Sequence, residues 1–312
     1  MEKDKKIYIA GHRGLVGSAI ERALREQGYT SILTRTSSEL DLRDNQAVDE
    51  FFASEQPDFV FLAAAKVGGI IANNDYPADF IRDNLLIQTN VIDASYRYGV
   101  EKLLFLGSTC IYPKMAPQPL REDYLLTGEL EPTNKAYAIA KIAGITMCQS
   151  YNRQYGTRFI SVMPTNMYGP NDNFDLTTSH VLPALLRKFH EARTQSLPSV
   201  EVWGSGSPLR EFLHADDLAE ACIFLMDQYE ENEIINVGVG RDITIKDLAL
   251  LIRSIVGYEG EIIFDASKPD GTPRKLVDVT KINELGWSAR IELEDGIRSI
   301  YKSYISDSLV KQ

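Results

Sequence analysis

Apolar residues in the first part of the chain form short continuous runs that alternate with segments of helical periodicity. Residues 6–10 are such a run and predict a strand. Residues 16–27 have helical spacing, with Glu21, Arg22 and Arg25 on the polar side. The glycine-rich stretch between them predicts a tight turn, so the chain is expected to open with a strand, a turn and a helix.

The alternation continues through the first half of the chain. Strands are expected at residues 31–36, 58–65, 102–108 and 158–164, and helices at residues 45–54, 77–98 and 136–155. Strands that alternate with helices are typical of a parallel sheet covered on both faces. The sequence therefore predicts an α/β fold with a Rossmann-type, doubly wound parallel sheet.

After Pro164 the rhythm loosens, which indicates a second, smaller lobe of mixed α/β character. It is expected to contain a helix at 181–192 and strands at 200–203 and 261–264, whereas a helix at 216–226 and a strand at 234–237 return to the first sheet. The boundaries predicted from this pattern are 1–165 plus about 215–240 for the first domain, and 166–214 plus 241–312 for the second.

The composition limits the kinds of partner that the chain is expected to bind. The chain has 312 residues and a formal net charge of −11, which argues against a nucleic-acid partner because such proteins need a basic surface. The first residues carry charges where a signal peptide needs an apolar core, and no run approaches the length of a membrane span. A cytoplasmic protein without a membrane partner is therefore expected.

The cysteines predict neither a disulfide framework nor a metal site. Cys110, Cys148 and Cys222 are few and scattered, and none forms a CxxC pair. A cysteine with a function here would act through its reactivity.

The glycine-rich turn predicts a dinucleotide site. Glycines in this spacing allow a tight turn and a close approach of the backbone to a pyrophosphate, and the following helix N-terminus favours an anion. The alternative is a glycine-rich turn that binds nothing, but the flanking strand and helix argue against it. The residues of the turn are Gly11, His12, Arg13, Gly14, Leu15, Val16 and Gly17.

The end of the second predicted strand favours NADPH over NADH. An NAD-binding protein usually has an acid there, whereas this chain has Arg35. Together with Arg13 in the turn, Arg35 offers charge-assisted hydrogen bonds to a 2′-phosphate. The alternative is that both arginines are solvated surface charges.

Tyr137 and Lys141 form a YxxxK pair in a predicted helix, where residues four apart lie on one face. A neighbouring ammonium is expected to lower the pKa of the Tyr137 phenol, which makes it a proton donor to a carbonyl oxygen. YxxxK also occurs by chance in many helices. Ser108 strengthens the hypothesis because it follows a predicted strand at the edge where parallel sheets build their active sites.

Longer segments of the sequence resemble those of a known protein family. The glycine turn, the Ser-Tyr-Lys set and two lobes resemble the extended short-chain dehydrogenases, and within them the chain is similar to the GDP-L-fucose synthase family. The similarity covers nearly the whole chain, and the strings that carry it include IAGHRGLVGSAI, LAAAKVGGI, NNDYPADFI, LGSTCIYP, EPTNKAYAIAKIAG, MPTNMYGPNDNF, WGSGSPLREFLHADD and FDASKPDGTPRK.

The resemblance implies two reactions in one pocket. The family epimerises C3 and C5 of GDP-4-keto-6-deoxy-D-mannose and then reduces C4 with NADPH. By position in the matching strings, Cys110 and His180 correspond to the acid and base of the epimerisation, and a thiolate and an imidazolium both move protons near neutral pH. Without the resemblance, Cys110 is better interpreted as a buried hydrophobe and His180 as a polar residue near a helix start.

The resemblance also implies the remaining contacts. Cationic side chains and an indole are expected to bind the GDP half of the substrate. The loop at residues 268–274 is expected to close over the sugar. The predicted helices at 77–98 and 136–155 are implied to pair in a four-helix homodimer interface. Expected substrate contacts are Lys188, Trp203, Arg210 and Asp270. Expected cofactor contacts are Gly11, His12, Arg13, Gly14, Leu15, Val16, Gly17, Arg35, Asp41, Leu42, Ala63, Ala64, Ala65, Lys141, Pro164, Thr165, Asn166, Met167 and His180.

Three alternatives stay open. The same chemistry on another GDP-keto-sugar would lead to GDP-colitose or a GDP-deoxyheptose. An NAD-recycling nucleotide-sugar 4-epimerase or 4,6-dehydratase is opposed by Arg35 and by the Cys110/His180 pair. A catalytically silent NADPH-binding regulator is opposed by the complete Ser-Tyr-Lys set.

Two further histidines are expected to have no catalytic role, with His190 facing solvent and His214 making a structural contact.

Overall fold

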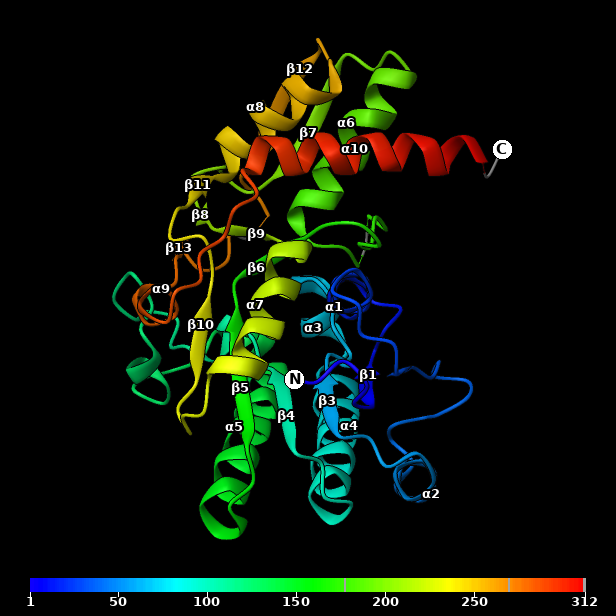
Figure 1. Ribbon diagram of the computed structural model, residues 1–312. Helices are drawn as coiled ribbons and strands as arrows, with labels where there is room; N and C mark the ends of the chain where they lie inside the picture. The colour runs from blue at the N-terminus through cyan, green and yellow to red at the C-terminus, as the bar shows by residue number, and fades with distance from the viewer. Residues whose placement is uncertain (177, 269, 311–312) are drawn as a thin grey trace.

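The computed structural model describes residues 1–176, 178–268 and 270–310 and contains a six-stranded parallel sheet (Figure 1). The strand order is β10-β5-β4-β3-β1-β2. The order reverses between β1 and β3, which is where doubly wound sheets place their ligands. The bounds are β1 (Ile7–Ala10), β2 (Ile32–Leu33), β3 (Phe59–Leu62), β4 (Lys102–Leu106), β5 (Phe159–Pro164) and β10 (Ile235–Val237).

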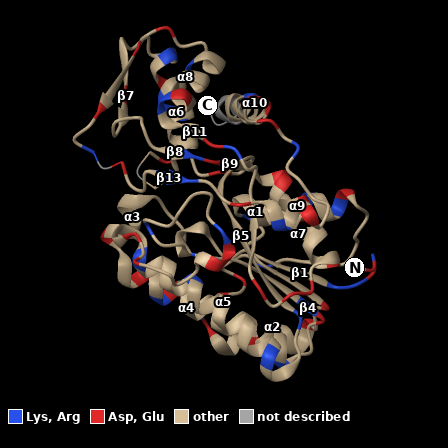
Figure 2. Ribbon diagram, turned by 90° about the vertical axis from the view of Figure 1, so that its left-hand side faces the viewer, with Lys and Arg blue, Asp and Glu red and all other residues tan. Residues whose placement is uncertain are grey.

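Helices cover both faces of this sheet, as Figure 2 shows. Every residue of β1, β3 and β4 is buried, as expected for strands with a helical layer on each side. One face carries α2 (Asn45–Glu55), α4 (Pro77–Arg97) and α5 (Lys135–Tyr155), and the other carries α1 (Leu15–Glu26), α7 (Ala215–Gln228) and α9 (Thr280–Glu284). The fold prediction of a doubly wound parallel sheet is therefore confirmed.

A second hydrophobic core lies above the carboxyl ends of the strands (Figure 1). It is built from helices that bury one apolar side each against a small parallel pair of strands. These elements are α6 (Val181–Thr194), β7 (Ser199–Trp203), α8 (Ile245–Val256), β12 (Glu261–Asp265) and α10 (Leu293–Val310).

Short segments join the two cores. One small sheet has the order β11-β8-β13, and β6 pairs with β9. The bounds are β6 (Asn166–Tyr168), β8 (Leu209–Arg210), β9 (Phe212–His214), β11 (Ile243–Thr244) and β13 (Arg274–Lys275). The remaining elements are α3 (Ile70–Asp75) and the short 3₁₀ helices η1 (Thr109–Ile111), η2 (Glu122–Tyr124) and η3 (Pro132–Asn134).

Most predicted helices and strands are confirmed, with ends that differ by a few residues. The strand expected at 31–36 is an exception, because β2 has only two residues, which pair with Ile7 and Tyr8 at the edge of the sheet. Helices α8 and α10 were not expected. Among the described residues, no helix has the length and apolar character needed to cross a bilayer.

Candidate active site

The turn between β1 and α1 has no room for a side chain at Gly11 or at Gly17. Gly11 has φ +89°, and a Cβ there would lie 2.7 Å from the backbone nitrogen of Ala64. A Cβ on Gly17 would collide with the carbonyl oxygen of Gly11. The Nδ1 atom of His12 is buried without a hydrogen-bond partner in the described part of the chain, and Gly14 caps α1 without a side-chain hydrogen bond. These free donors and the bare backbone fit a pyrophosphate.

Ala63, Ala64 and Ala65 follow β3 beside this turn, at the point where the strand order reverses. The Ala63 N–H donates to the carbonyl of Ala10 at 3.0 Å, so the ends of β1 and β3 stay close together. Small side chains here leave space over the sheet edge for a flat ligand. The structure thus brings the first two groups of expected cofactor residues together.

The two arginines expected at a 2′-phosphate differ in their surroundings. Arg35 lies beyond the end of β2, where its guanidinium donates to Glu55 Oε1 at 2.6 Å and to the carbonyl of Thr34. Arg13 is exposed and makes no hydrogen bond or ion pair within the described residues. Hydrogen bonds from Thr36 lower the pKa of Glu39, and the charges of Arg35 and Arg13 lower it further, so both guanidinium groups lie within electrostatic reach of Glu39.

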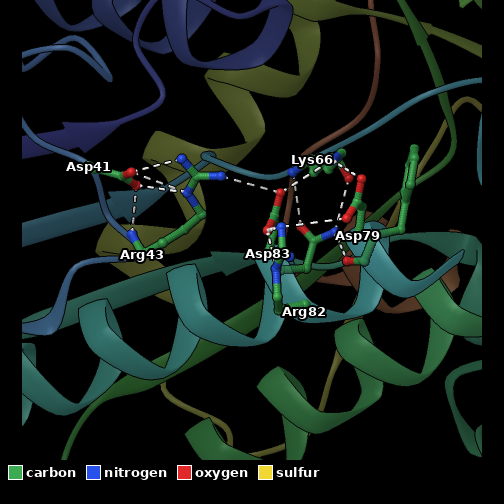
Figure 3. A network of polar contacts seen from close by, with 8 residues as sticks. Asp41, Arg43, Lys66, Asp79, Arg82 and Asp83 are labelled. Atoms are coloured by element: carbon green, nitrogen blue, oxygen red, sulfur yellow. Dashed lines mark hydrogen bonds and ion pairs between the residues drawn. The ribbon is translucent and has the colours of Figure 1, made fainter. Parts of the chain in front are cut away.

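Asp41, expected near the adenine, lies at one end of a network of charged groups (Figure 3). Its carboxylate accepts hydrogen bonds from Arg43, including one of 2.7 Å from Nη2, and Arg43 also approaches the buried side chain of Asp83 on α4. Leu42 is tied to the same helix because its carbonyl accepts from Asn90 at 2.9 Å. An adenine contact by Asp41 would therefore share its carboxylate with Arg43. The other members of the network are Lys66, Asp79 and Arg82.

Ser108, Tyr137 and Lys141 meet where β4 ends. Ser108 caps η1 and accepts a hydrogen bond from the backbone N–H of Cys110 at 3.3 Å. Its hydroxyl also lies near enough to the phenol of Tyr137 on α5 to lower the pKa of that phenol. One turn further along α5, the buried Lys141 ammonium donates to the carbonyl of Leu106 at 2.7 Å and lies 5.7 Å from the centre of the Tyr137 ring.

The expectation that Lys141 lowers the pKa of Tyr137 is wrong for this arrangement. Burial raises the pKa of the Tyr137 phenol, Cys110 raises it further, and the hydroxyl of Ser108 opposes both. The physical reason is the position of the ammonium, which is directed to the Leu106 carbonyl. Burial instead lowers the pKa of Lys141 to about 8. Tyr137 is therefore held in the protonated form that a proton donor needs.

The two residues expected to transfer protons, Cys110 and His180, come from two elements, η1 and the start of α6. Cys110 lies in η1 and is buried, which raises the pKa of its thiol, while Lys275, Ser108 and Lys141 oppose the rise. His180 caps α6 and is exposed, yet the protein that crowds its ring lowers the pKa of its imidazole, and Lys275 lowers it further. Both expected proton-transfer groups are thus in electrostatic contact with Lys275.

The segment expected near the nicotinamide follows directly from β5. Pro164 pairs with Val237 of β10, and Thr165 donates its N–H to the Val237 carbonyl at 3.1 Å. Asn166 and Met167 begin β6, and the Asn166 side-chain amide donates to the carbonyl of Glu211 at 2.8 Å. The segment is therefore fixed over the carboxyl end of the sheet.

Four residues expected to bind substrate gather on the second core. The Lys188 ammonium lies 5.1 Å from the centre of the Trp203 ring, which is 44% exposed. Arg210 donates to the Asp270 carbonyl at 3.3 Å, and the Asp270 carboxylate accepts from Ser205. An exposed indole with cations beside it offers a flat apolar face next to positive charge. Of the expected closing loop, Pro269 lies outside the described residues.

Sequence reasoning missed two residues of this region. Lys275 on β13 lies near Cys110 and Arg210, and Arg210 pairs with it in register. Glu211 is fully buried, and its carboxylate accepts from the backbone of Val239 and Val277 at 2.6 Å and 3.0 Å. It ties the loop after β10 to the segment after β13. The signals available were an acid directly before the apolar pair Phe212 and Leu213, and two adjacent basic residues after Pro273.

The other histidines have structural contacts. His214 caps α7, and its Nδ1 accepts from the Asp216 N–H at 3.2 Å, as expected. The expectation that His190 faces solvent is wrong, because its ring packs on Tyr301 and Tyr304 and its Nδ1 lies 3.2 Å from the Tyr301 hydroxyl. Within the described residues, no group of three or more potential ligands is placed to hold a metal ion.

Comparisons with known proteins agree with this geometry. The NAD dependent epimerase/dehydratase family matches residues 7–238. GDP-L-fucose synthase 1 of Arabidopsis thaliana is 59% identical over 98% of this chain and 95% of its own length. GDP-L-fucose synthase of Escherichia coli K12 is 57% identical over 97% of each chain. A solved GDP-mannoheptose C4 reductase from Campylobacter jejuni with NADP bound is 43% identical, covers 98% of this chain and 99% of its own, and superposes with a TM-score of 0.89.

Proposed function

The chain belongs to the NAD dependent epimerase/dehydratase family, and we propose that it converts GDP-4-keto-6-deoxy-D-mannose to GDP-L-fucose by 3,5-epimerisation and NADPH-dependent 4-reduction. The observation that carries this proposal is a group of four side chains near the end of β4, with His180 linked to them through Lys275. Lys275 acts on the pKa values of both Cys110 and His180. Ser108, Tyr137 and Lys141 suit carbonyl reduction, and Cys110 and His180 suit proton transfer at carbon.

NADPH, when bound, supplies the hydride for C4. The turn at 11–17 and the N-terminus of α1 would hold its pyrophosphate, because they offer bare backbone and free donors. Arg13 is free to pair with a 2′-phosphate, and Arg35 would add to it by releasing Glu55. Ala63 to Ala65 and Pro164 to Met167 would lie along the two sides of the dinucleotide.

For epimerisation, the C4 ketone acidifies the protons on C3 and C5. The Cys110 thiolate removes one of these protons, and the electron pair moves into an enolate whose charge rests on the C4 oxygen. His180 then gives a proton to the other face of the same carbon. The crowding and the Lys275 charge that lower the pKa of His180 make its imidazolium a stronger acid for this step.

For reduction, Tyr137 protonates the C4 oxygen. The hydroxyl of Ser108 lies near the Tyr137 phenol, and the high pKa that burial gives Tyr137 keeps the proton in place until the oxygen becomes basic. Lys141 holds the end of β4 through the Leu106 carbonyl.

The GDP half is proposed to bind the second core. Lys188 and Arg210 would pair with the diphosphate, Trp203 would stack on the guanine, and Asp270 would hold the loop that closes over the sugar. The proposed division assigns cofactor binding to residues 1–165 and 215–240 and nucleotide-sugar binding to 166–214 and 241–312. The reaction centre then lies between the two parts.

We further propose a cytoplasmic homodimer formed through α4 and α5. These helices pack together, with Gln88 donating to the Ala140 carbonyl at 2.6 Å. Leu86 on α4 and Ile139 on α5 are each 40% exposed. The measurement is the molar mass in solution of the wild type and of Ile139→Arg, with a monomer expected for the variant if these helices form the interface.

The alternative substrate is the GDP-keto-sugar precursor of a GDP-deoxyheptose or of GDP-colitose. The likeness to the heptose reductase supports the heptose. The test offers each keto-sugar with NADPH and with NADH and identifies products by NMR. Formation of GDP-L-fucose at the highest kcat/KM, with NADPH preferred, supports the proposal. A higher kcat/KM with a heptose substrate would replace the substrate assignment and retain the chemistry.

A further inference from the structure

Lys275 lies where the two parts of the site meet. It is the last residue of β13 and pairs in register with Arg210 on β8. Its side chain is half-buried and lines a cavity together with Thr109, Cys110 and Glu131. Lys275 therefore shares this cavity with the thiol of Cys110.

The Lys275 ammonium makes no hydrogen bond or ion pair with any described residue. The nearest acid, Glu131, is already paired with Lys114 at 2.8 Å. Withdrawing a cation from water without a partner is costly, and the cost shows as a lowered pKa of Lys275. An anion beside this ammonium would offset that cost.

Cys110 is the anion-forming group that lies next to this charge. The groups facing the thiol are Ser108 at the end of β4, Tyr137 and Lys141 on α5, and Lys275 on β13. Of those that oppose the effect of burial on the pKa of Cys110, Lys275 contributes most. Lys141 is occupied by the Leu106 carbonyl. Of the two lysines among the described residues that face the thiol, Lys275 is the one without a hydrogen-bond partner.

We propose that Lys275 is the counter-ion that holds Cys110 as a thiolate for the epimerisation step. This rests on the proposed function, in which Cys110 accepts a proton from C3 or C5. The proton moves from carbon to sulfur, and the C–H electron pair enters the enolate. The positive charge of Lys275 then stabilises the new oxyanion in place of the thiolate, which has become a neutral thiol. The same charge makes the imidazolium of His180 a better donor, so one ammonium assists both transfers.

The test measures the ionisation of Cys110 without any substrate. The rate of Cys110 alkylation by iodoacetamide is followed from acidic to alkaline pH by peptide mass spectrometry, with the fully buried Cys148 and Cys222 as internal references. Lys275→Met should raise the midpoint of the pH profile by about one unit or more. Lys275→Arg should keep the midpoint near that of the wild type because the charge remains.

Two controls make the result specific. Lys246→Met removes an exposed lysine of α8 and should leave the midpoint unchanged. Lys275→Gln serves as a second neutral variant, and NADPH affinity and thermal unfolding report whether each variant is folded. An unchanged midpoint in a folded neutral variant would overturn the proposal. Because alkylation needs no sugar, an incorrect substrate assignment would leave this result intact.

Discussion

Replacing Tyr137 by Phe should separate the two half-reactions. The change removes one hydroxyl that lies near Ser108, and the ring keeps its edge contact with Phe80, whose ring centre is 6.4 Å away. The net loss of stability should be no more than about 1 kcal/mol, because a side-chain hydrogen bond contributes roughly that much. The variant should therefore fold and bind NADPH.

The effect on reduction should be much larger. A positioned general acid contributes about 10²–10⁴ in rate, which corresponds to roughly 2.7–5.4 kcal/mol in the activation free energy. NADPH oxidation followed by absorbance should fall by that factor. Exchange of the C3 and C5 protons with D₂O, followed by NMR of the unreduced sugar, should continue because Cys110 and His180 are unchanged.

The matched variant Cys110→Ser should give the opposite pattern, with exchange lost and reduction of the unepimerised ketone retained. Full NADPH oxidation by Tyr137→Phe would refute the assignment of the proton donor. Loss of both exchange and oxidation in a folded, cofactor-binding Tyr137→Phe would refute the division of labour between the two sets of residues.

Three further predictions follow from single residues. Arg35→Ala should raise KM for NADPH by about tenfold while leaving KM for NADH unchanged, since a charge-assisted phosphate contact is worth about 1.4 kcal/mol or more; equal effects on both cofactors would contradict the assignment. Lys102 is fully buried and donates to three carbonyls at the end of α7, including that of Tyr229 at 2.6 Å. Lys102→Met should therefore lower the free energy of unfolding by about 2–4 kcal/mol in urea titrations, and an unchanged midpoint would contradict this role. The pKa of Lys141 is lowered to about 8, so the ammonium is present below that pH and the rate of reduction should fall as pH rises through it; a kcat profile that is flat through this range would show that the charge is not required.

The first half of the fold was predictable because each strand there carries its own signal. The runs at β1, β3 and β4 are apolar throughout, which is what a strand covered on both faces requires. The predicted length of strand β2 was too great because its length is set by the edge pairing with β1, and a local pattern does not contain that information. Helix α8 buries Ile245, Leu248 and Ile252, a spacing present in the sequence but overlooked among short strands.

The candidate site was predictable where one segment carries the chemistry, as in the glycine turn and the YxxxK pair. It was less predictable where distant segments meet. Lys275 is separated from Cys110 by most of the chain, and only folding brings β13 beside η1. The pKa of Tyr137 was misjudged for the same reason, since helix spacing places Lys141 near the ring but does not reveal that its ammonium is directed to the Leu106 carbonyl.

The most direct test of the account is the wild-type reaction with GDP-4-keto-6-deoxy-D-mannose and NADPH in D₂O, with NMR of the purified product. The account predicts GDP-L-fucose with solvent deuterium at both C3 and C5 and hydrogen from NADPH at C4. A reduced sugar without deuterium at C3 and C5 would contradict it, because the chain would then be a simple C4 reductase.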